Sequence, residues 1–330
     1  MNPRENVLAS IRHEEGQWVP CPSVDGSMRV VFHDLTEYPE GPGTDDWGVR
    51  WAVGEEETGA GLPEEYPISD PSDIESYPLP DPDRANLMEP AKRALEDIDR
   101  DCALVFGDNG WGIFERSWLL VGMERLFLWM HEAPEAVRTL MRRITDVKVR
   151  ISERFIDEVG VDGIRYGDDW AGESGLMMGP ALWRKFIKPQ QERLYRVCRD
   201  RDRLIFQHSD GHVEQIVHDL VEMGLDVLNP LQPACNDVEA VKRRHGGELA
   251  FHGVISSRVL HMGTPDDVRR EVRGRVDQLS PGGGYIVAPA HGLAYPEANL
   301  HAFRQAAVEY CRVPDEWQVE SERARGDVEV

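Results

Sequence analysis

From about residue 102 onward, short apolar runs alternate with longer segments of helical periodicity. In residues 212–224, for example, the spacing places Val213, Val217 and Leu220 on one helical face before Gly224. Repeated strand–helix units predict a parallel sheet with right-handed crossovers. The predicted strands are the runs CALVFGDNG, VDGIRYGDD, LIFQHSDG, LDVLNPLQP, LAFHGVI and GGYIVAPAHG.

The number of these units approaches eight if residues 18–26, WVPCPSVDG, supply the first strand. Each predicted strand ends in polar residues. No G-x-G-x-x-G follows a strand, so the usual fingerprint of a dinucleotide-binding sheet is missing. We therefore predict the α/β class, as a (β/α)8 TIM barrel with an elaborated N-terminal region.

The N-terminal third has a different composition. Residues 36–85 are rich in proline, glycine and acidic residues, and this composition resists long helices and strands. We expect residues 26–100 to form an elaborated region over one end of the barrel. A disordered linker is the alternative, against which Trp47 and Trp51 favour packing. The predicted limits are 1–313 for a single barrel domain and 314–330 for a charged tail.

Charge and cysteine content limit the partners and the compartment. The chain has 330 residues and a formal net charge of −23, which repels nucleic acid and anionic membranes. A soluble protein, a basic partner and a salt-adapted host would each explain this charge. The longest apolar stretch is interrupted by Glu124 and Arg125, so we expect no membrane span. Five scattered cysteines without C-x-x-C and an N-terminus without a secretory signal predict a cytoplasmic protein. The oligomeric state stays open, and a homodimer is one possibility.

Polar residues at the predicted strand ends are the candidates for an active site, because barrel enzymes place theirs at the C-terminal ends of the strands. Strand ends also carry such residues as helix caps. Capping is the simpler interpretation for Asp108, Asn229 and one of Asp168 and Asp169. The full set is Asp25, Asp108, Asp168, Asp169, His208, Asp210, Asn229, Gln232, His252 and His291.

The segment LIFQHSDGH concentrates part of this set. Side chains alternate along a strand, so His208 and Asp210 point to the same face. His291 ends the last predicted strand, which lies near the others across the mouth of a closed barrel. These three residues predict a nitrogen and oxygen ligand set with an open position, as in catalytic zinc sites. A hydrogen-bonded cluster without metal is the alternative, which the spacing alone slightly favours. His212 is expected to cap the next helix or to face solvent.

The aromatic residues between the strands are mostly expected in the core. Trp170 is the exception, because it follows Asp169 at a strand end and is placed to line a pocket. The residues expected in the core are Trp111, Phe114, Trp118, Trp129 and Trp183.

Several longer segments resemble the uroporphyrinogen decarboxylase superfamily. The resemblance is strong from about residue 160 to 310 and weaker before it. It is carried by TDDWGVRW, YGDDWAGESGLMMGPALWRKFIKP, FQHSDGHVEQIVHDLVEMGLDVLNPLQP, LAFHGVIS, GTPDDVRREVRGRV and PGGGYIVAPAHGLAYPEANLHAF. The superfamily implies a (β/α)8 barrel, in agreement with the pattern above.

The superfamily has two main branches. The porphyrinogen decarboxylase needs no metal and grips substrate carboxylates with an N-terminal arginine-rich motif. Here the corresponding region, VPCPSVDGSMRVV, holds only Arg29, and a polycarboxylate would meet a strongly acidic protein. The other branch comprises cobalamin-dependent methyltransferases, whose zinc is held by a His-x-Cys pair and a later cysteine. His208 matches the first ligand, whereas Asp210 and His291 stand at the two cysteine positions.

The resemblance to the second branch implies zinc, and cobalamin carried by a corrinoid protein as partner. A carboxylate and an imidazole in place of two thiolates make the ion harder and better suited to polarising oxygen. The resulting hypothesis is methyl transfer between a methoxy-type small-molecule donor and the corrinoid protein. The catalytic roles fall to Asp168, Asp169 and His252, and the substrate-binding roles to Asp25, Trp47, Asp108, Trp170, Asn229 and Gln232.

The competing hypothesis is a metal-independent decarboxylase of a carboxylated ring compound. Asp25, Asp169, His252 and His291 would then act as acids, bases and hydrogen-bond donors. A non-catalytic binding module is disfavoured, because burying so many ionisable groups in a barrel mouth is costly without a use.

Overall fold

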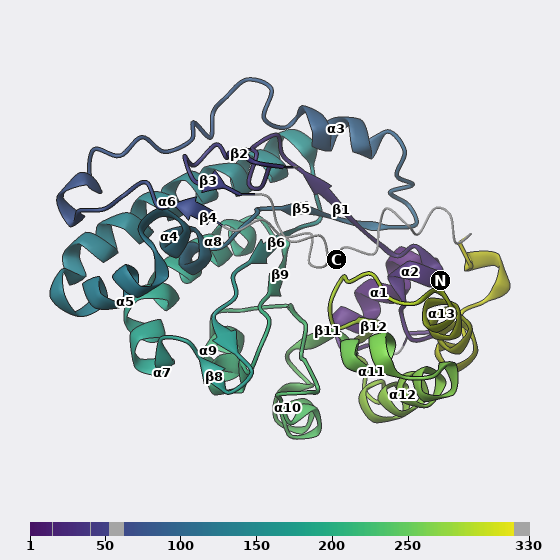
Figure 1. Cartoon of the computed structure of the whole chain (residues 1–330). Coiled ribbons are helices and arrows are strands. Elements are labelled where there is room, and N and C mark those ends of the chain that lie inside the picture. The colour runs from purple at the N-terminus through teal and green to yellow at the C-terminus, as the bar shows by residue number, and fades with distance from the viewer. Residues whose placement is uncertain (15, 40, 53–62, 320–330) are drawn as a thin grey trace.

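Seven parallel strands form the main sheet, and their order in the sheet follows their order in the chain. The computed structural model describes residues 1–14, 16–39, 41–52 and 63–319. The strands are β1 (Met28–Phe32), β5 (Leu104–Asp108), β6 (Gly163–Gly167), β9 (Leu204–His208), β10 (Val227–Asn229), β11 (Ala250–Ile255) and β12 (Tyr285–Pro289). Figure 1 shows them at the centre of the molecule, with the helices outside. The six strands predicted after residue 102 are confirmed.

The sheet curls into a barrel around an apolar interior. Phe106 of β5 and Phe206 of β9 meet there with ring centroids 5.7 Å apart, although β6 separates their strands. Val7 and Ile11 of the first helix join the same cluster. The other buried members are Met28, Leu104, Val227, Ala250 and Ile286, so six strands contribute to it. The predicted TIM-barrel class is therefore confirmed.

The prediction for the first strand was wrong. Residues Pro22–Asp25 form a short helix, α2, and the first strand is β1, beginning at Met28. The segment before α2 still lies against β12, because Val287 N donates to Pro20 O at 2.8 Å. Pro20 and Pro22 have no N–H to donate to a neighbouring strand. The place of an eighth strand is thus held by an irregular segment.

Helices cover the outside of the barrel. They are α4 (Ile113–Val121), α5 (Met123–Glu132), α6 (Pro134–Arg154), α7 (Gly179–Leu182), α8 (Lys188–Arg199), α9 (Val217–Glu222), α10 (Val238–His245), α11 (Ser257–Met262), α12 (Pro265–Leu279) and α13 (Glu297–Cys311). The first helix, α1 (Pro3–Ile11), packs instead against the interior cluster. Thr264 caps α12 in a capping box with Asp267. The long apolar stretch forms two helices, α4 and α5, which meet at Gly122 with φ of 89°. No helix in the described part of the chain is long and apolar enough to cross a membrane.

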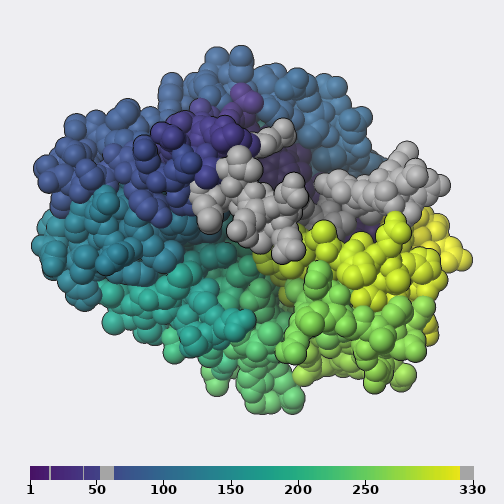
Figure 2. Space-filling view, viewed as in Figure 1, coloured from purple at the N-terminus to yellow at the C-terminus, as the bar shows by residue number. Residues whose placement is uncertain are grey.

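The elaborated N-terminal region packs beside the barrel mouth. It contains a small antiparallel sheet of β2 (Gly43–Thr44), β3 (Arg50–Trp51) and β4 (Pro63–Glu65), followed by α3 (Glu89–Leu95). Arg116 of α4 is fully buried and holds this region through Asp45 at 2.7 Å and through Glu37. Trp47 and Trp51 are buried, as expected. Figure 2 shows the region in purple and blue, next to the helices in teal. Part of the predicted tail, residues 320–330, lies outside the described residues.

Candidate active site

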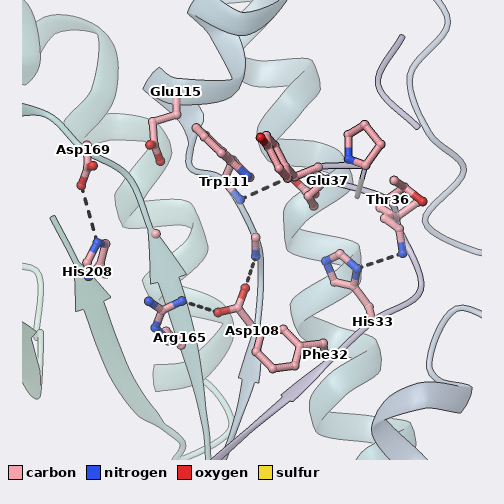
Figure 3. A pocket seen from close by; sticks show the side chains of 15 residues that line it. Phe32, His33, Thr36, Glu37, Asp108, Trp111, Glu115, Arg165, Asp169 and His208 are labelled. Carbon is pink, nitrogen blue, oxygen red and sulfur yellow. Dashed lines mark hydrogen bonds and ion pairs between the residues drawn. The ribbon is translucent and has the colours of Figure 1, made fainter. Parts of the chain in front are cut away.

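A cavity of about 940 Å³ opens at the C-terminal ends of β1, β5, β6 and β9. The loop after β1, residues 33–39, forms one wall, and the start of α4 forms another. Figure 3 shows how polar side chains from these elements surround the space. The cavity therefore lies at the end of the barrel where the sequence predicts an active site.

Strand alternation explains which polar side chains reach the mouth. His208 stands two residues beyond Phe206, which packs in the barrel interior. Asp108 follows Phe106 in the same way, and Asn229 follows Val227. Residues two apart on a strand share a face, so these polar groups form a layer above the apolar interior.

Three side chains at the mouth of the barrel lie close enough together to bind one metal ion. The donor atoms of Asp169, His208 and Asp210 all lie within 4.8 Å of one another. His208 Nε2 is 3.7 Å from Asp169 Oδ1, and the same oxygen accepts a hydrogen bond from the backbone N–H of Asp210 at 2.8 Å. The site combines one imidazole nitrogen with two carboxylates.

Asn229 fixes the orientation of the His208 ring. Its Nδ2 is 2.8 Å from His252 Nδ1 and 3.4 Å from the His252 carbonyl, which can only accept a hydrogen bond. The amide oxygen therefore faces His208, whose Nδ1 lies 2.7 Å away and must donate to it. In this arrangement Nε2 of a neutral His208 carries no proton, and its lone pair is directed towards Asp169.

Asp210 is held from both sides. Gln232 Nε2 donates to its Oδ1 at 2.8 Å, while Gln232 Oε1 accepts from the backbone N–H of Gly211 at 2.9 Å. His291 Nε2 lies 3.1 Å from Asp210 Oδ2, and this hydrogen bond raises the pKa of His291. Among the described residues, Asp169 rather than His291 completes the close group with His208 and Asp210.

Two further carboxyl groups line the cavity in different states. Burial works to raise the pKa of Glu37, but the positive charges of Lys148 and Arg116 prevail and lower it to about 2. The pKa of Glu115 is raised, first by burial and then by the negative charges of Asp169 and Asp168. The wall thus offers a carboxylate at Glu37 and a carboxyl that resists ionisation at Glu115.

Asp25, predicted to bind substrate, lies outside the cavity wall. Its carboxylate accepts hydrogen bonds from Trp18 Nε1, Cys21 N and Ser27 N, each at 3.0 Å, and it is only 2% exposed. Trp18 and Cys21 precede α2, and Ser27 lies between α2 and β1, so this carboxylate ties the two sides of the helix together. The structure assigns Asp25 to the fold.

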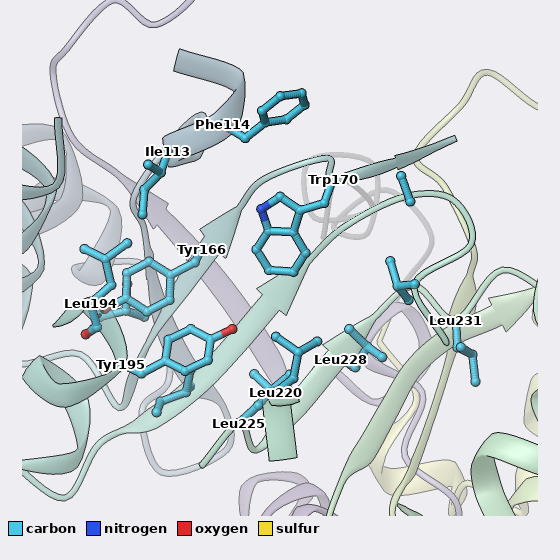
Figure 4. Packing of buried hydrophobic residues seen from close by; sticks show 14 of the residues in the cluster. Ile113, Phe114, Tyr166, Trp170, Leu194, Tyr195, Leu220, Leu225, Leu228 and Leu231 are labelled. Carbon is cyan, nitrogen blue, oxygen red and sulfur yellow. Dashed lines mark hydrogen bonds between the residues drawn. The ribbon is translucent and has the colours of Figure 1, made fainter. Parts of the chain in front are cut away.

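Asp168 and Trp170 also have structural roles. Asp168 accepts from the backbone N–H groups of Phe114 and Glu115 at 2.9 Å each, so it caps α4 from a neighbouring strand end. Trp170 Nε1 donates to the same carboxylate at 2.7 Å. A Cβ at Gly112 would lie 2.1 Å from Asp168 Cβ, so this close approach requires glycine. Trp170 is fully buried within the core (Figure 4) and does not reach the cavity.

The predicted roles of Trp47 and His252 change for similar reasons. Trp47 is fully buried under Arg116, whose guanidinium lies 4.9 Å from the ring centroid. His252 is 1% exposed, and burial lowers its pKa to about 3, so it is neutral and cannot act as an acid near neutral pH. It contributes through its hydrogen bond with Asn229.

The residues that line the cavity without having been predicted there include Glu37, Trp111, Glu115 and Arg165. Trp111 was assigned to the core and lies instead in the cavity wall. Arg165 could have been found, because in VDGIRYGDD it alternates with Gly163 and Gly167 on one strand face. Glu37 and Glu115 carry no such signal, since loop folding and a helix start determine their positions.

Comparisons with known proteins identify the family. The sequence pattern described as Uroporphyrinogen decarboxylase (URO-D) matches residues 47–310. Curated relatives named uroporphyrinogen decarboxylase include that of Sodalis glossinidius, 22% identical over 83% of this chain and 75% of the relative. That of Azotobacter vinelandii is 23% identical over 87% of this chain and 79% of the relative.

A solved structure shares the fold. It is described as a methyltransferase from Methanosarcina mazei, with a TM-score of 0.74 and 18% sequence identity, covering 94% of this chain and 99% of that one. At this low identity, the structural match supports the barrel architecture alone. The family pattern covers most of the chain. The chain is therefore an enzyme of the uroporphyrinogen decarboxylase family.

Proposed function

We propose that this enzyme transfers a methyl group from a methoxy-type small molecule to the cobalt of a corrinoid protein. The observation that carries the proposal is the convergence of Asp169, His208 and Asp210 at the cavity, with the His208 ring held in a ligand-ready tautomer by Asn229. In the transfer, the bond between the methyl carbon and oxygen breaks, the methyl group goes to the acceptor, and the donor leaves as an alcohol after taking up a proton.

The three side chains fit a divalent metal such as zinc. One imidazole nitrogen and two carboxylates within 4.8 Å form a mixed nitrogen and oxygen ligand set. When bound, the metal would act as a Lewis acid on the ether oxygen of the donor. Gln232 and Asn229 hold two of the ligands in place, which is the usual role of residues behind a metal site.

Apolar side chains give the donor a binding surface. Phe32, at the end of β1, is 51% exposed and lines the cavity together with Trp111. We assign to these two residues the contact with the apolar part of the donor. The sequence had suggested Trp47 and Trp170 for this role, but both are buried. We expect a cytoplasmic reaction, and the five unpaired cysteines agree with a reducing compartment.

The alternative is carbon dioxide release from a carboxylated ring compound, which the names of the curated relatives favour. The orientation of Arg29 disfavours a polycarboxylate substrate such as a porphyrinogen. It alternates on β1 with Met28 and Val30, which pack in the barrel interior, so it points away from the cavity.

Metal analysis of the purified protein, joined to an assay with reduced cobalamin, tests the proposal. We expect about one divalent ion per chain and a change in cobalamin absorbance on methylation. His208→Ala and Asp210→Ala should lose the metal and at least 100-fold of the activity, roughly the upper end of ligand-shell effects. His212→Ala is the matched control, because this histidine lies four residues from His208 and its ring faces Glu214.

Two results would contradict the proposal. One is full activity of protein freed of metal. The other is release of carbon dioxide from a carboxylated ring compound without any methylation of cobalamin, which would support the alternative.

A further inference from the structure

The cavity contains a cation that the proposed chemistry does not use. Arg165 projects from β6 into the barrel mouth and is the only lysine or arginine among the described residues that line the cavity. It lies between His208 and Asp108 in Figure 3. An arginine inside a barrel needs a partner for each of its N–H groups, because burial removes them from water.

The partners of Arg165 are incomplete. Its Nη1 donates to Asp108, whose other oxygen accepts from Gly110 N at 2.7 Å. Its Nε is shielded from solvent and has no acceptor among the described residues. Of the whole side chain, 18% remains exposed. Asp108 is thus the only acceptor that this guanidinium has among the described residues, although the side chain lines the cavity.

The remaining acids of the wall are already committed. Glu37 pairs with Arg116 and accepts from Trp47 Nε1 at 3.1 Å. Asp169 and Asp210 belong to the proposed metal site, and Glu115 accepts a hydrogen bond from the backbone N–H of Gly112 at 3.3 Å. Among the described acids of the wall, Asp108 alone pairs with Arg165, so the exposed part of the guanidinium is open to water or to a ligand.

We propose that Arg165 binds a carboxylate group on the methyl donor. A carboxylate is planar and offers two oxygens, which match two parallel N–H groups of a guanidinium. This inference rests on the proposed function for the methoxy part of the donor and adds its second recognition element.

The backbone register limits the size of the donor. Gly167 of β6 is paired with His208 of β9, and Arg165 lies two residues earlier on β6. Strand geometry then puts the Cα atoms of Arg165 and His208 roughly 8 Å apart. The two side chains therefore enter the same barrel mouth from neighbouring strands, and we expect a donor that carries the methoxy group and the carboxylate on one small ring.

Calorimetric titration tests this inference without any methyl transfer. The probes are para-methoxybenzoate and the neutral para-methoxybenzyl alcohol, each titrated into the full chain in the presence of a chelator. The chelator ensures that a carboxylate bound to metal does not count. We expect the carboxylate to bind at least 10-fold more tightly than the alcohol in the wild type, and to lose that advantage in Arg165→Gln.

Two variants keep the result interpretable. Asp108→Asn retains an oxygen for Gly110 N but no longer competes for Arg165, so it should strengthen carboxylate binding. Arg275→Gln is the matched control, because Arg275 has a similar exposure of 22% and one carboxylate partner, Glu271 at 3.0 Å, outside the cavity. It should bind both probes as the wild type does.

The inference is overturned if Arg165→Gln keeps the preference for the carboxylate, or if the wild type binds both probes equally or neither. Failure of methyl transfer with intact carboxylate binding would count against the proposed function alone. The two ideas therefore fail separately.

Discussion

At the scale of single residues, the neighbours of an aspartate decide its role. Asp25 and Asp168 each accept several N–H hydrogen bonds and are buried. Asp169 and Asp210 each place a carboxylate oxygen within 4.8 Å of a ring nitrogen of His208. All four stand at similar places in the sequence pattern, and only the donors that surround them separate structural aspartates from candidate ligands.

Asn229 should control metal affinity without being a ligand. We expect Asn229→Ala to weaken metal binding by about 10- to 100-fold, because the His208 ring loses the acceptor that fixes its tautomer. Competition with a chelating dye measures the affinity. Asn299→Ala provides the control, since Asn299 is also buried and bonds two backbone carbonyls far from the cavity. Equal metal affinity in both variants would refute the role of Asn229.

Glu37 should make stability depend on pH in the acid range. Its folded-state pKa of about 2 lies below the ordinary 4.5, so the unfolded chain takes up the proton first as the pH falls. The stabilisation is complete above about pH 4.5, worth about 3 kcal/mol, and is lost as the pH falls to about 2.

Denaturation of Glu37→Gln measures this contribution. The variant should lose about 3 kcal/mol of unfolding free energy near pH 7 and roughly half of that near pH 3. Glu135→Gln, at a side chain that is 85% exposed, should change stability by less than about 0.5 kcal/mol. A loss that does not vary with pH would show that Glu37 acts by packing alone.

At the scale of elements, α1 closes the N-terminal end of the barrel. Val7 and Ile11 lie four residues apart on one face of the helix and join the interior cluster of the strands. Asn2 caps the helix in a capping box with Glu5. The apolar pattern of nine residues is too short to reveal this packing, so the segment carries no predicted role.

Shortening Ile11 should therefore cost as much as a core mutation. We expect Ile11→Ala to lower the unfolding free energy by about 2–4 kcal/mol, since it leaves a cavity in a closed interior. Leu128→Ala, at a helical position that is 50% exposed, should cost less than about 1 kcal/mol. Urea denaturation measures both, and equal losses would mean that α1 does not close the barrel.

At the scale of the whole molecule, the net charge of −23 opposes the compact state. Salt should therefore stabilise the protein, because the Debye length falls from ~30 Å at 0.01 M to ~3 Å at 1 M. We expect the thermal midpoint to rise by several degrees as sodium chloride increases over this range. Sucrose of equal osmolality is the control for solvent effects unrelated to charge. A midpoint that falls with salt would show that attractive ion pairs outweigh the repulsion.

The sequence by itself determined the barrel class, six of the seven strands and the side of the barrel that carries the cavity. These features follow from local periodicity, because a buried parallel strand needs a continuous apolar run and its end needs polar residues. The same periodicity predicts His208 and Asp210 on one face, and their ligand atoms lie within 4.8 Å of each other.

Only the tertiary structure decided which polar residues meet. Asp169 joins His208 and Asp210 because β6 lies beside β9, and Glu37 reaches the cavity because the N-terminal region folds against α4. For the same reason, Trp111 lies in the cavity wall although it was expected in the core, and Trp170 is buried although it was expected to line a pocket. Periodicity along a chain specifies which face a side chain takes, whereas contacts between distant segments depend on how the elements pack against one another.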